Sequence, residues 1–447
     1  MAILLVGISF PVSADDLRKG SPQTALDHYL LKKDSSYVWK KISGGKIGST
    51  EYAGLVLTSQ TWQGLVWKHQ LYVLKPESCE TDCRNALLLI GGGSWKSEFE
   101  TVPAELPREA KRMASVAEQL KCPVAVLLQV PNQPIFDGKY EDQIIAYTFE
   151  KFIRTGKSDW PLLLPMVKSA HRAIDTTVDY AKKQWKLSLD AFTVTGASKR
   201  GWTTWLSGAT DRRVTAIAPM VIDVLNMKPQ MDHQKSAWGK YSNQIRDYTD
   251  RGLQELLSTE KGKLLREIVD PYSYRERLTQ PKLLFIGTND AYWPIDALKF
   301  YWDDLKNQKY VVYVPNNGHS LQDYTRMIGT LNGFQMAAAG AQAMPEFNWK
   351  FSATTGSVQL TISTVEKPDK IQLWSAKSET RDFRNSQWKA KIIARDNNGN
   401  YQITVRSPES GSLAFFGEGI FNRDNFPCYL STNARVLQAK TPNERNE

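Results

Sequence analysis

The chain has 447 residues and a formal net charge of +10, with 41% hydrophobic and 23% charged residues. At roughly 100–200 residues per domain, this length predicts two or three domains, or one large domain with an appendage. The composition is that of a globular protein, and the absence of any run of ~18 apolar residues argues against a membrane span. No dense Lys/Arg cluster or nucleic-acid motif is present, so we expect no nucleic-acid partner. The charge is either a solubility feature or an attraction for acidic partners such as polyanionic glycans or an anionic membrane surface.

The N-terminus resembles an export signal. A short apolar run ends in Val12-Ser13-Ala14, a small-residue cleavage site, although the usual basic start is missing. An apolar first strand is the alternative interpretation. We predict a signal peptide at residues 1–14 and a periplasmic or secreted protein.

The four cysteines agree with an oxidising compartment. Cys79 and Cys83 lie in a polar loop, and their spacing predicts a small disulfide loop. No second Cys/His pair stands at ligand spacing, so we expect no metal site.

Strand and helix patterns alternate between residues 24 and 343. A short helix and extended chain are expected over 24–42, and a loop-rich stretch over 131–160. The other expected strands are 48–74 (antiparallel), 86–90, 123–130, 187–195, 214–224, 281–287 and 310–314. The other expected helices are 105–120, 162–185, 202–208, 294–305 and 320–343. This alternation predicts a mostly parallel sheet covered by helices on both faces.

Two further segments stand apart from this pattern. Residues 225–278 are polar, aromatic and largely helical, and this insertion of ~50 residues predicts a lid, since core connections usually span 2–6 residues. Residues 346–440 show short alternating runs, for example 357–362 and 401–405, separated by turn signals such as 396–400. They predict a separate C-terminal β-sandwich domain.

The sequence Gly196-Ala197-Ser198-Lys199-Arg200-Gly201 follows an expected strand and precedes an expected helix. This is the context of a nucleophile elbow, in which a strained turn lifts the serine hydroxyl above the sheet. Arg200 occupies the position of the usual second glycine, and Gly201 comes one residue later. We therefore predict that Ser198 is a nucleophile.

A serine nucleophile requires a general base and an acid that orients it. Of the five histidines, His319 follows the expected last strand in a loop, which is where an α/β-hydrolase presents its base. Asp290 follows the preceding strand, and the order Ser198, Asp290, His319 is that of the fold. Asp223 is a rival acid, and Asp296 is a weaker one.

The oxyanion that forms during acyl transfer needs fixed hydrogen-bond donors. The backbone N–H of Lys199 supplies one. The segment Gly91-Gly92-Gly93-Ser94, after an early strand, supplies the other from Gly93 or Ser94. A phosphate-binding loop is the competing interpretation, but no Lys-Ser/Thr follows at the required spacing, and we expect no cofactor.

Side chains in the same loops have further expected roles. Trp95, Tyr292 and Trp293 are candidates for lining the substrate cleft, although most tryptophans serve packing. Cations directly after a nucleophile are unexpected at a helix N-terminus. We expect Arg200 to pair with a carboxylate, whereas for Lys199 both a structural role and a charge directed at the oxyanion or an acidic substrate stay open.

The chain resembles the PhoPQ-activated pathogenicity-related protein family. The resemblance rests on four segments: Thr195 to Trp202, Gly287 to Asp290 with Trp293, Pro315 to His319, and Asp382-Phe383-Arg384. It covers nearly the whole mature chain and implies an exported α/β-hydrolase with a C-terminal β domain. The hydrolase domain would then cover residues 15–345, with the lid at about 225–278.

These features leave two functions open. The first is a secreted serine hydrolase acting on an ester or peptide bond of a small-molecule, glycan or peptide substrate. The second is a secreted signalling or binding protein on a hydrolase scaffold, because a fold does not fix a function. The presence of Ser198, Asp290 and His319 together favours the hydrolase.

Overall fold

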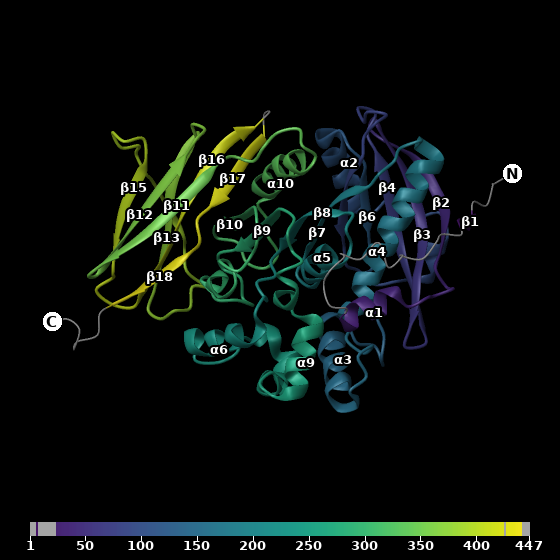
Figure 1. Ribbon diagram of the computed structural model, residues 1–447, viewed down its shortest axis with the longest axis horizontal. Helices are drawn as coiled ribbons and strands as arrows, with labels where there is room; N and C mark the ends of the chain where they lie inside the picture. Colours follow the sequence, from purple (N-terminus) through teal and green to yellow (C-terminus); the bar gives the residue numbers. More distant parts are fainter. Residues whose placement is uncertain (1–5, 8–23, 424–425, 440–447) are drawn as a thin grey trace. The chain divides into compact units, whose positions relative to one another are not determined.

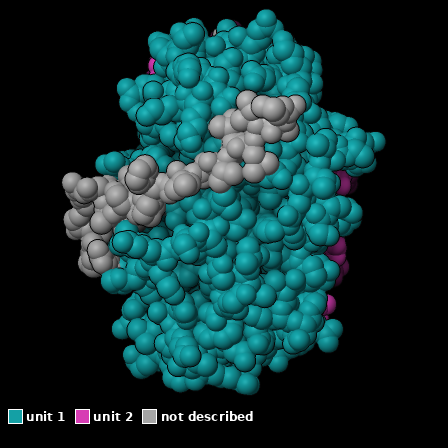
Figure 2. All heavy atoms as spheres, turned by 90° about the vertical axis from the view of Figure 1, so that its right-hand side faces the viewer, with its two compact units in different colours: residues 1–222, 246–282, 305–308 teal, residues 223–245, 283–304, 309–447 magenta. Residues whose placement is uncertain are grey.

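A computed structural model describes residues 6–7, 24–423 and 426–439 of the chain. The predicted signal peptide at residues 1–14 therefore lies, apart from residues 6–7, outside the described part. The chain divides into two units, coloured teal and magenta in Figure 2. The first contains residues 1–222, 246–282 and 305–308, and the second contains residues 223–245, 283–304 and 309–447.

The first unit contains a sheet of strands in the order β1-β2-β3-β4-β6-β5-β7-β8. The strands are β1 (Val6–Gly7), β2 (Val38–Ile47), β3 (Thr50–Trp62), β4 (Leu65–Lys75), β5 (Asn85–Ile90), β6 (Val124–Leu127), β7 (Ala191–Ala197) and β8 (Val214–Met220). The pairs from β1 to β6 are antiparallel, and β6, β5, β7 and β8 then run parallel. Strand β5 lies among the parallel strands, and its apolar run is mostly buried, as expected for a central strand.

Helices pack on this sheet and on one another (Figure 1). They are α1 (Ala25–Leu31), α2 (Arg108–Leu120), α3 (Glu141–Thr155), α4 (Leu163–Tyr180), which a π-helical turn extends to Trp185, and α5 (Lys199–Thr210). Helix α2 packs on β3, β4 and β6, α4 packs on β3 and β6, and α5 packs on β7 and β8. The expectation of a loop-rich stretch over 131–160 missed α3, whose buried residues include Ile144, Ile145, Phe149 and Phe152.

The predicted lid segment is helical. Helix α6 (Met227–Trp238) belongs to the second unit, and α7 (Arg246–Thr249), α8 (Leu253–Leu256) and α9 (Glu260–Val269) belong to the first. Helices α7, α8 and α9 all pack on α3. A covering role for this segment stays a prediction.

The second unit contains the neighbouring strands β9 (Lys282–Gly287) and β10 (Lys309–Val314), and the helix α10 (Tyr324–Ala338). The helix expected over 294–305 is reduced to a short 3-10 helix, Ala297–Phe300. The C-terminal strands are β11 (Phe347–Thr354), β12 (Ser357–Thr364), β13 (Lys370–Ser378), β14 (Lys389–Ile392), β15 (Tyr401–Arg406), β16 (Ser412–Arg423), β17 (Phe426–Ser431) and β18 (Arg435–Gln438).

These C-terminal strands form two antiparallel sheets. One has the order β11-β12-β15, and the other has the order β14-β13-β16-β17, with β18 beside β16. The sheets face each other, because the Phe351 and Phe415 rings meet 6.1 Å apart and Gly417 leaves room for Ile362. Helix α10 and strand β10 both pack on β17. The predicted fold class, an α/β-hydrolase with C-terminal antiparallel sheets, is confirmed.

Candidate active site

Ser198 lies at the sharp turn between β7 and α5. Its backbone has φ 58° and ψ −127°, outside the conformations that a serine normally adopts. The Ser198 N–H donates a hydrogen bond to the carbonyl oxygen of Met220, 2.8 Å away, which ties the turn to the end of β8. The structure therefore has the strand–turn–helix geometry that the sequence predicts for a nucleophile elbow.

Two glycines make this turn possible. A Cβ atom on Gly196 would lie 2.9 Å from the backbone of Arg200. A Cβ atom on Gly201 would lie 2.6 Å from the Ile222 side chain and 2.9 Å from the carbonyl oxygen of Met220. Both approaches are too close for any side chain. Gly201, which comes one position later than the usual second glycine of the elbow, is thus the residue at which α5 packs closely on β8.

The two cations after Ser198 both pair with carboxylates. Arg200 forms a two-pronged hydrogen bond with Glu141, with nitrogen–oxygen distances of 2.6 and 2.7 Å. The Nζ atom of Lys199 lies 2.9 Å from Glu141 and 3.3 Å from Asp142, and Lys199 is only 6% exposed. Burial alone would raise the pKa of Glu141, but Arg200 and Lys199 outweigh it and lower the pKa to about 2. The expected carboxylate partner of Arg200 is Glu141, and the structure shows the Lys199 ammonium ion engaged by two carboxylates.

The Glu141 carboxylate also connects the elbow to the glycine-rich loop after β5. The side-chain amide of Gln133 donates to Glu141 (2.7 Å) and to the carbonyl oxygen of Gly93 (3.2 Å). Gly92 lies against the Arg200 guanidinium group, since a Cβ atom there would be 2.5 Å from a guanidinium nitrogen. Gly93 has φ 105°, which favours glycine. Arg200, Glu141 and Gln133 therefore fix the loop that carries the predicted oxyanion donors.

The remaining predicted oxyanion residues flank these contacts. The Lys199 N–H is in the first turn of α5, where helical N–H groups have no acceptor within the helix. Ser94 is half-buried beside Trp95, whose N–H donates to the carbonyl oxygen of Gln133 at 3.0 Å. Trp95 is half-buried and packs edge-on against Phe99.

In the second unit, His319 and Asp290 form a hydrogen-bonded pair. Nδ1 of His319 lies 2.9 Å from Oδ2 of Asp290, and Asp290 is only 4% exposed. Because a carboxylate can only accept, Nδ1 carries the proton, and Nε2 is left as the basic atom of the ring. The Tyr292 N–H donates to the other Asp290 oxygen (2.8 Å), and its ring stacks on His319 with centroids 4.2 Å apart. Trp293, the other predicted cleft residue, is buried.

Two asparagines attach the loops of Asp290 and His319 to one C-terminal segment. The Asn289 side chain donates to the carbonyl oxygen of Ser386 at 2.7 Å, with longer contacts of 3.2 Å to those of Phe383 and Arg384. Asn316 exchanges two hydrogen bonds with the backbone of Trp388, at 2.8 and 3.1 Å. The segment 383–388 thus positions the predicted acid and base together, a role that the sequence pattern does not reveal.

Helix α6 holds the Asp290 loop from another side. The Gln234 side chain donates to the carbonyl oxygen of Tyr292 at 2.7 Å. The Ser242 hydroxyl donates to the carbonyl oxygen of Ala291 at 2.6 Å. The Ser242 N–H donates to the side-chain oxygen of Gln234. Trp238, at the end of the helix, packs against the Arg384 guanidinium group. These contacts give Arg384 of the Asp382-Phe383-Arg384 motif a structural partner in α6.

The rival acids occupy different environments. Asp223 is 1% exposed, and burial, followed by the charges of Asp290 and Asp296, raises its pKa to about 7. The Tyr301 hydroxyl partly opposes this shift, although it does not reach hydrogen-bonding geometry. Asp296 instead bonds to His233 at 2.7 Å. The structure therefore gives Asp290 the contact with His319, while the assignment of catalytic roles stays a prediction.

Comparison with known proteins identifies the family. The family model for PhoPQ-activated pathogenicity-related protein matches residues 26–384. The chain belongs to this family. It is also 32% identical over 434 residues to autocrine proliferation repressor protein A of Dictyostelium discoideum, covering 88% of this chain and 85% of that protein.

Two solved structures show more distant similarity. Acetyl xylan esterase 1 from a Thermoanaerobacterium species is 14% identical with a TM-score of 0.48, covering 70% of this chain and 91% of the esterase. An acetyl xylan esterase from a Paenibacillus species is 13% identical with a TM-score of 0.49, covering 72% and 97%.

The predicted disulfide between Cys79 and Cys83 is wrong, because both residues are free thiols in the structure. Two successive turns, closed by Cys79 N–H to Pro76 and Cys83 N–H to Glu80, carry the two thiols, which donate to the carbonyl oxygens of Glu80 (3.5 Å) and Asn85 (3.4 Å). The proximity of the two thiols lowers the pKa of Cys83 to about 7 and raises that of Cys79. The sequence spacing of Cys79 and Cys83 alone does not distinguish two free thiols from a disulfide.

Two features are absent from the described part of the chain. No cluster of three or more His, Cys, Asp or Glu side chains in residues 24–423 and 426–439 is arranged to hold a metal ion. Within the same part of the chain, every helix is too short or too polar to cross a bilayer.

Proposed function

We propose that the protein is a serine hydrolase in which Ser198 attacks an ester or amide carbonyl with help from His319 and Asp290. The observation that carries this proposal is the backbone of Ser198, held at φ 58° and ψ −127° between a strand and a helix. Residues in sparsely populated backbone regions cost about 1–3 kcal/mol and cluster at active sites. The Asp290–His319 pair supports the same function independently.

The acylation step would use each group once. The Ser198 Oγ atom bonds to the carbonyl carbon while its proton passes to Nε2 of His319. Asp290, which holds Nδ1–H, stabilises the imidazolium that forms. The oxyanion accepts hydrogen bonds from the Lys199 N–H and from the Gly93 or Ser94 N–H. His319 then protonates the leaving alcohol or amine as its bond to the carbonyl carbon breaks, and the acyl group stays on Ser198.

Deacylation reverses these roles with water as the nucleophile. His319 removes a proton from a water molecule, whose oxygen bonds to the acyl carbon. Collapse of the second tetrahedral intermediate releases the carboxylic acid and returns the proton to Ser198. In this scheme Arg200 and Glu141 act as positioning residues, because they hold the elbow and the glycine-rich loop together.

A second candidate is a signalling protein on the same scaffold. The observation in its favour is the 32% identity to a protein named for autocrine repression of proliferation. We also propose export to the periplasm or beyond, from the Val12-Ser13-Ala14 junction. N-terminal sequencing of the protein recovered from outside the cytoplasm tests this: cleavage after Ala14 is expected, and an intact Met1 contradicts it.

Steady-state kinetics with p-nitrophenyl acetate and p-nitroanilide substrates test the hydrolase. We expect Ser198→Ala and His319→Ala each to lower kcat/KM by at least about a thousandfold, since such triads act as a unit. The matched control is His28→Ala, which removes an exposed histidine of α1 and leaves kcat/KM unchanged. Equal turnover by Ser198→Ala and the wild type contradicts the hydrolase, and absence of turnover in every protein favours the signalling candidate.

A further inference from the structure

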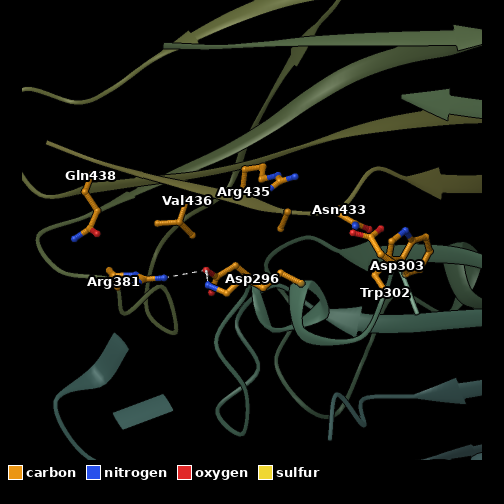
Figure 3. Close-up of a pocket in the computed structure, with 10 residues that line it drawn as sticks. Asp296, Trp302, Asp303, Arg381, Asn433, Arg435, Val436 and Gln438 are labelled. Carbon is orange, nitrogen blue, oxygen red and sulfur yellow. Dashed lines mark hydrogen bonds and ion pairs between the residues drawn. The ribbon is translucent and has the colours of Figure 1, made fainter. Parts of the chain in front are cut away.

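The second unit contains a polar pocket of about 320 Å³, drawn in Figure 3. Its lining comes from the segment after β9, from Arg381 after β13, and from the C-terminal region around β18. An adjoining cavity of about 450 Å³ shares Trp302, Asp303, Asn433 and Arg435 with it. Both volumes lie in the range of small-ligand sites, roughly 300–1,000 Å³. Neither lining includes Asp290 or His319, so the pocket belongs to a different part of this unit's surface.

Positive charge predominates in these linings. They contain four cations and two carboxylates: Lys299, Lys350, Arg381, Arg435, Asp296 and Asp303. Asp296 already bonds to Lys299 (2.7 Å) and Arg381 (2.9 Å), the second of which is visible in Figure 3. This ion pairing leaves a net positive charge, which favours an anionic ligand.

Several polar side chains of the pocket lack a polar partner among the described side chains. Among the described residues, none forms a side-chain hydrogen bond or ion pair with Asp303, Arg435 or Gln438. All three are exposed. Arg435 supplies several donors, Asp303 supplies acceptors, and the amide of Gln438 supplies both. A ligand that carries hydroxyl groups as well as a negative charge could bond to the Arg435 donors, the Asp303 acceptors and the Gln438 amide.

The adjoining cavity adds aromatic surface. Trp349 is half-exposed, and its ring lies 6.1 Å from that of Trp302 at an angle of 39°. Phe351 lies in the same lining, beneath the Arg435 guanidinium group. A flat, partly exposed indole ring can stack on an apolar ligand face and has its own N–H at one edge.

We propose that this pocket binds a saccharide that carries a carboxylate, such as a uronic-acid unit of an acidic glycan. Arg435 suits the carboxylate, because a guanidinium group matches the planar carboxylate with two parallel hydrogen bonds. Asp303 and Gln438 face the hydroxyl groups, and Trp349 supports the ring. The two carboxylates in the lining disfavour a dianionic phosphate. The site is independent of hydrolysis and would hold an acidic glycan on the protein.

Calorimetric titration of the full chain with tri-galacturonate tests the proposal. We expect saturable binding, at least about tenfold weaker in Arg435→Gln and in Trp349→Ala. The matched control is Arg406→Gln, which removes the same charge from an exposed position of β15 outside both linings and keeps the wild-type affinity. Circular dichroism of each variant verifies folding, and Arg435→Gln, at an exposed position, tests the site even if Trp349→Ala does not fold.

Other outcomes overturn the proposal. Absence of binding at millimolar tri-galacturonate excludes the site, and equal weakening by Arg406→Gln reduces it to general charge attraction. A neutral galactose trimer that binds as tightly contradicts the role of the carboxylate. Acetate or AMP that binds as tightly contradicts the role of the saccharide. Because binding is measured without turnover, the result does not depend on whether Ser198 is a catalytic nucleophile.

Discussion

Asp223 provides a direct test of the electrostatics around the proposed acid–base pair. Its carboxylate is 1% exposed, and burial raises its pKa from 3.8 to about 7, with the charges of Asp290 and Asp296 acting in the same direction. Between these two pH values the folded protein binds a proton that the unfolded chain has released. Stability therefore falls as the pH rises from about 4 to about 7, and the loss is complete above that range.

The size of this effect follows from the two pKa values. At 1.36 kcal/mol per pH unit, the pKa difference makes the wild type about 4 kcal/mol less stable at pH 8, and about 2 kcal/mol less stable at pH 5, than it is well below pH 4. Asp223→Asn keeps the shape of the side chain and removes the charge. We expect the variant to be more stable than the wild type at pH 8 and to gain about 2 kcal/mol less at pH 5.

Urea unfolding of both proteins at pH 5 and pH 8, followed by tryptophan fluorescence, measures this difference. Asp369→Asn is the control, because it makes the same change at an exposed position of the same unit. A stability difference between Asp223→Asn and the wild type that is equal at the two pH values, or a variant less stable at pH 8, would refute the reasoning.

Three further predictions concern the positioning of the site. Gly201→Ala forces a methyl group to within 2.9 Å of backbone oxygens, so we expect a loss of about 1–3 kcal/mol by urea unfolding. Arg200→Lys cannot keep both hydrogen bonds to Glu141, and kcat/KM for p-nitrophenyl acetate should fall about tenfold with the overall fold intact by circular dichroism. Asn316→Ala removes both hydrogen bonds to the Trp388 backbone, so kcat should fall several-fold while KM stays constant in ester kinetics. Unchanged values in any of these three measurements would contradict the role given to that residue.

Local features of the site were predictable from the sequence. The elbow around Ser198 is encoded in a few consecutive residues, and the strand before it has a strong apolar pattern. His319 and Asp290 each follow a predicted strand. Their order along the chain after Ser198 was enough to predict that they form a pair. The C-terminal sheets were predictable because strands with period-two alternation are separated by clear turn signals.

Contacts between distant segments were not predictable. Asn289 and Phe383 are 94 positions apart in the chain. Nothing in the sequence around either residue indicates that the Asn289 side-chain amide donates to the Phe383 carbonyl oxygen. Helix α3 was not predicted, because Pro131 and Pro134 indicate turns at the start of the stretch, whereas the helix begins only at Glu141. The extent of the helix expected over 294–305 was wrong, since only Ala297–Phe300 forms a 3-10 turn.

The most direct test of the central claim is peptide mapping of the protein after reaction with a fluorophosphonate. The reagent forms a stable covalent adduct only with a serine whose hydroxyl is activated by a base. We predict a single adduct, on the peptide containing Ser198, in the wild type and in His28→Ala, and none in His319→Ala. An adduct on another serine, or one on Ser198 that persists in His319→Ala, would contradict the account.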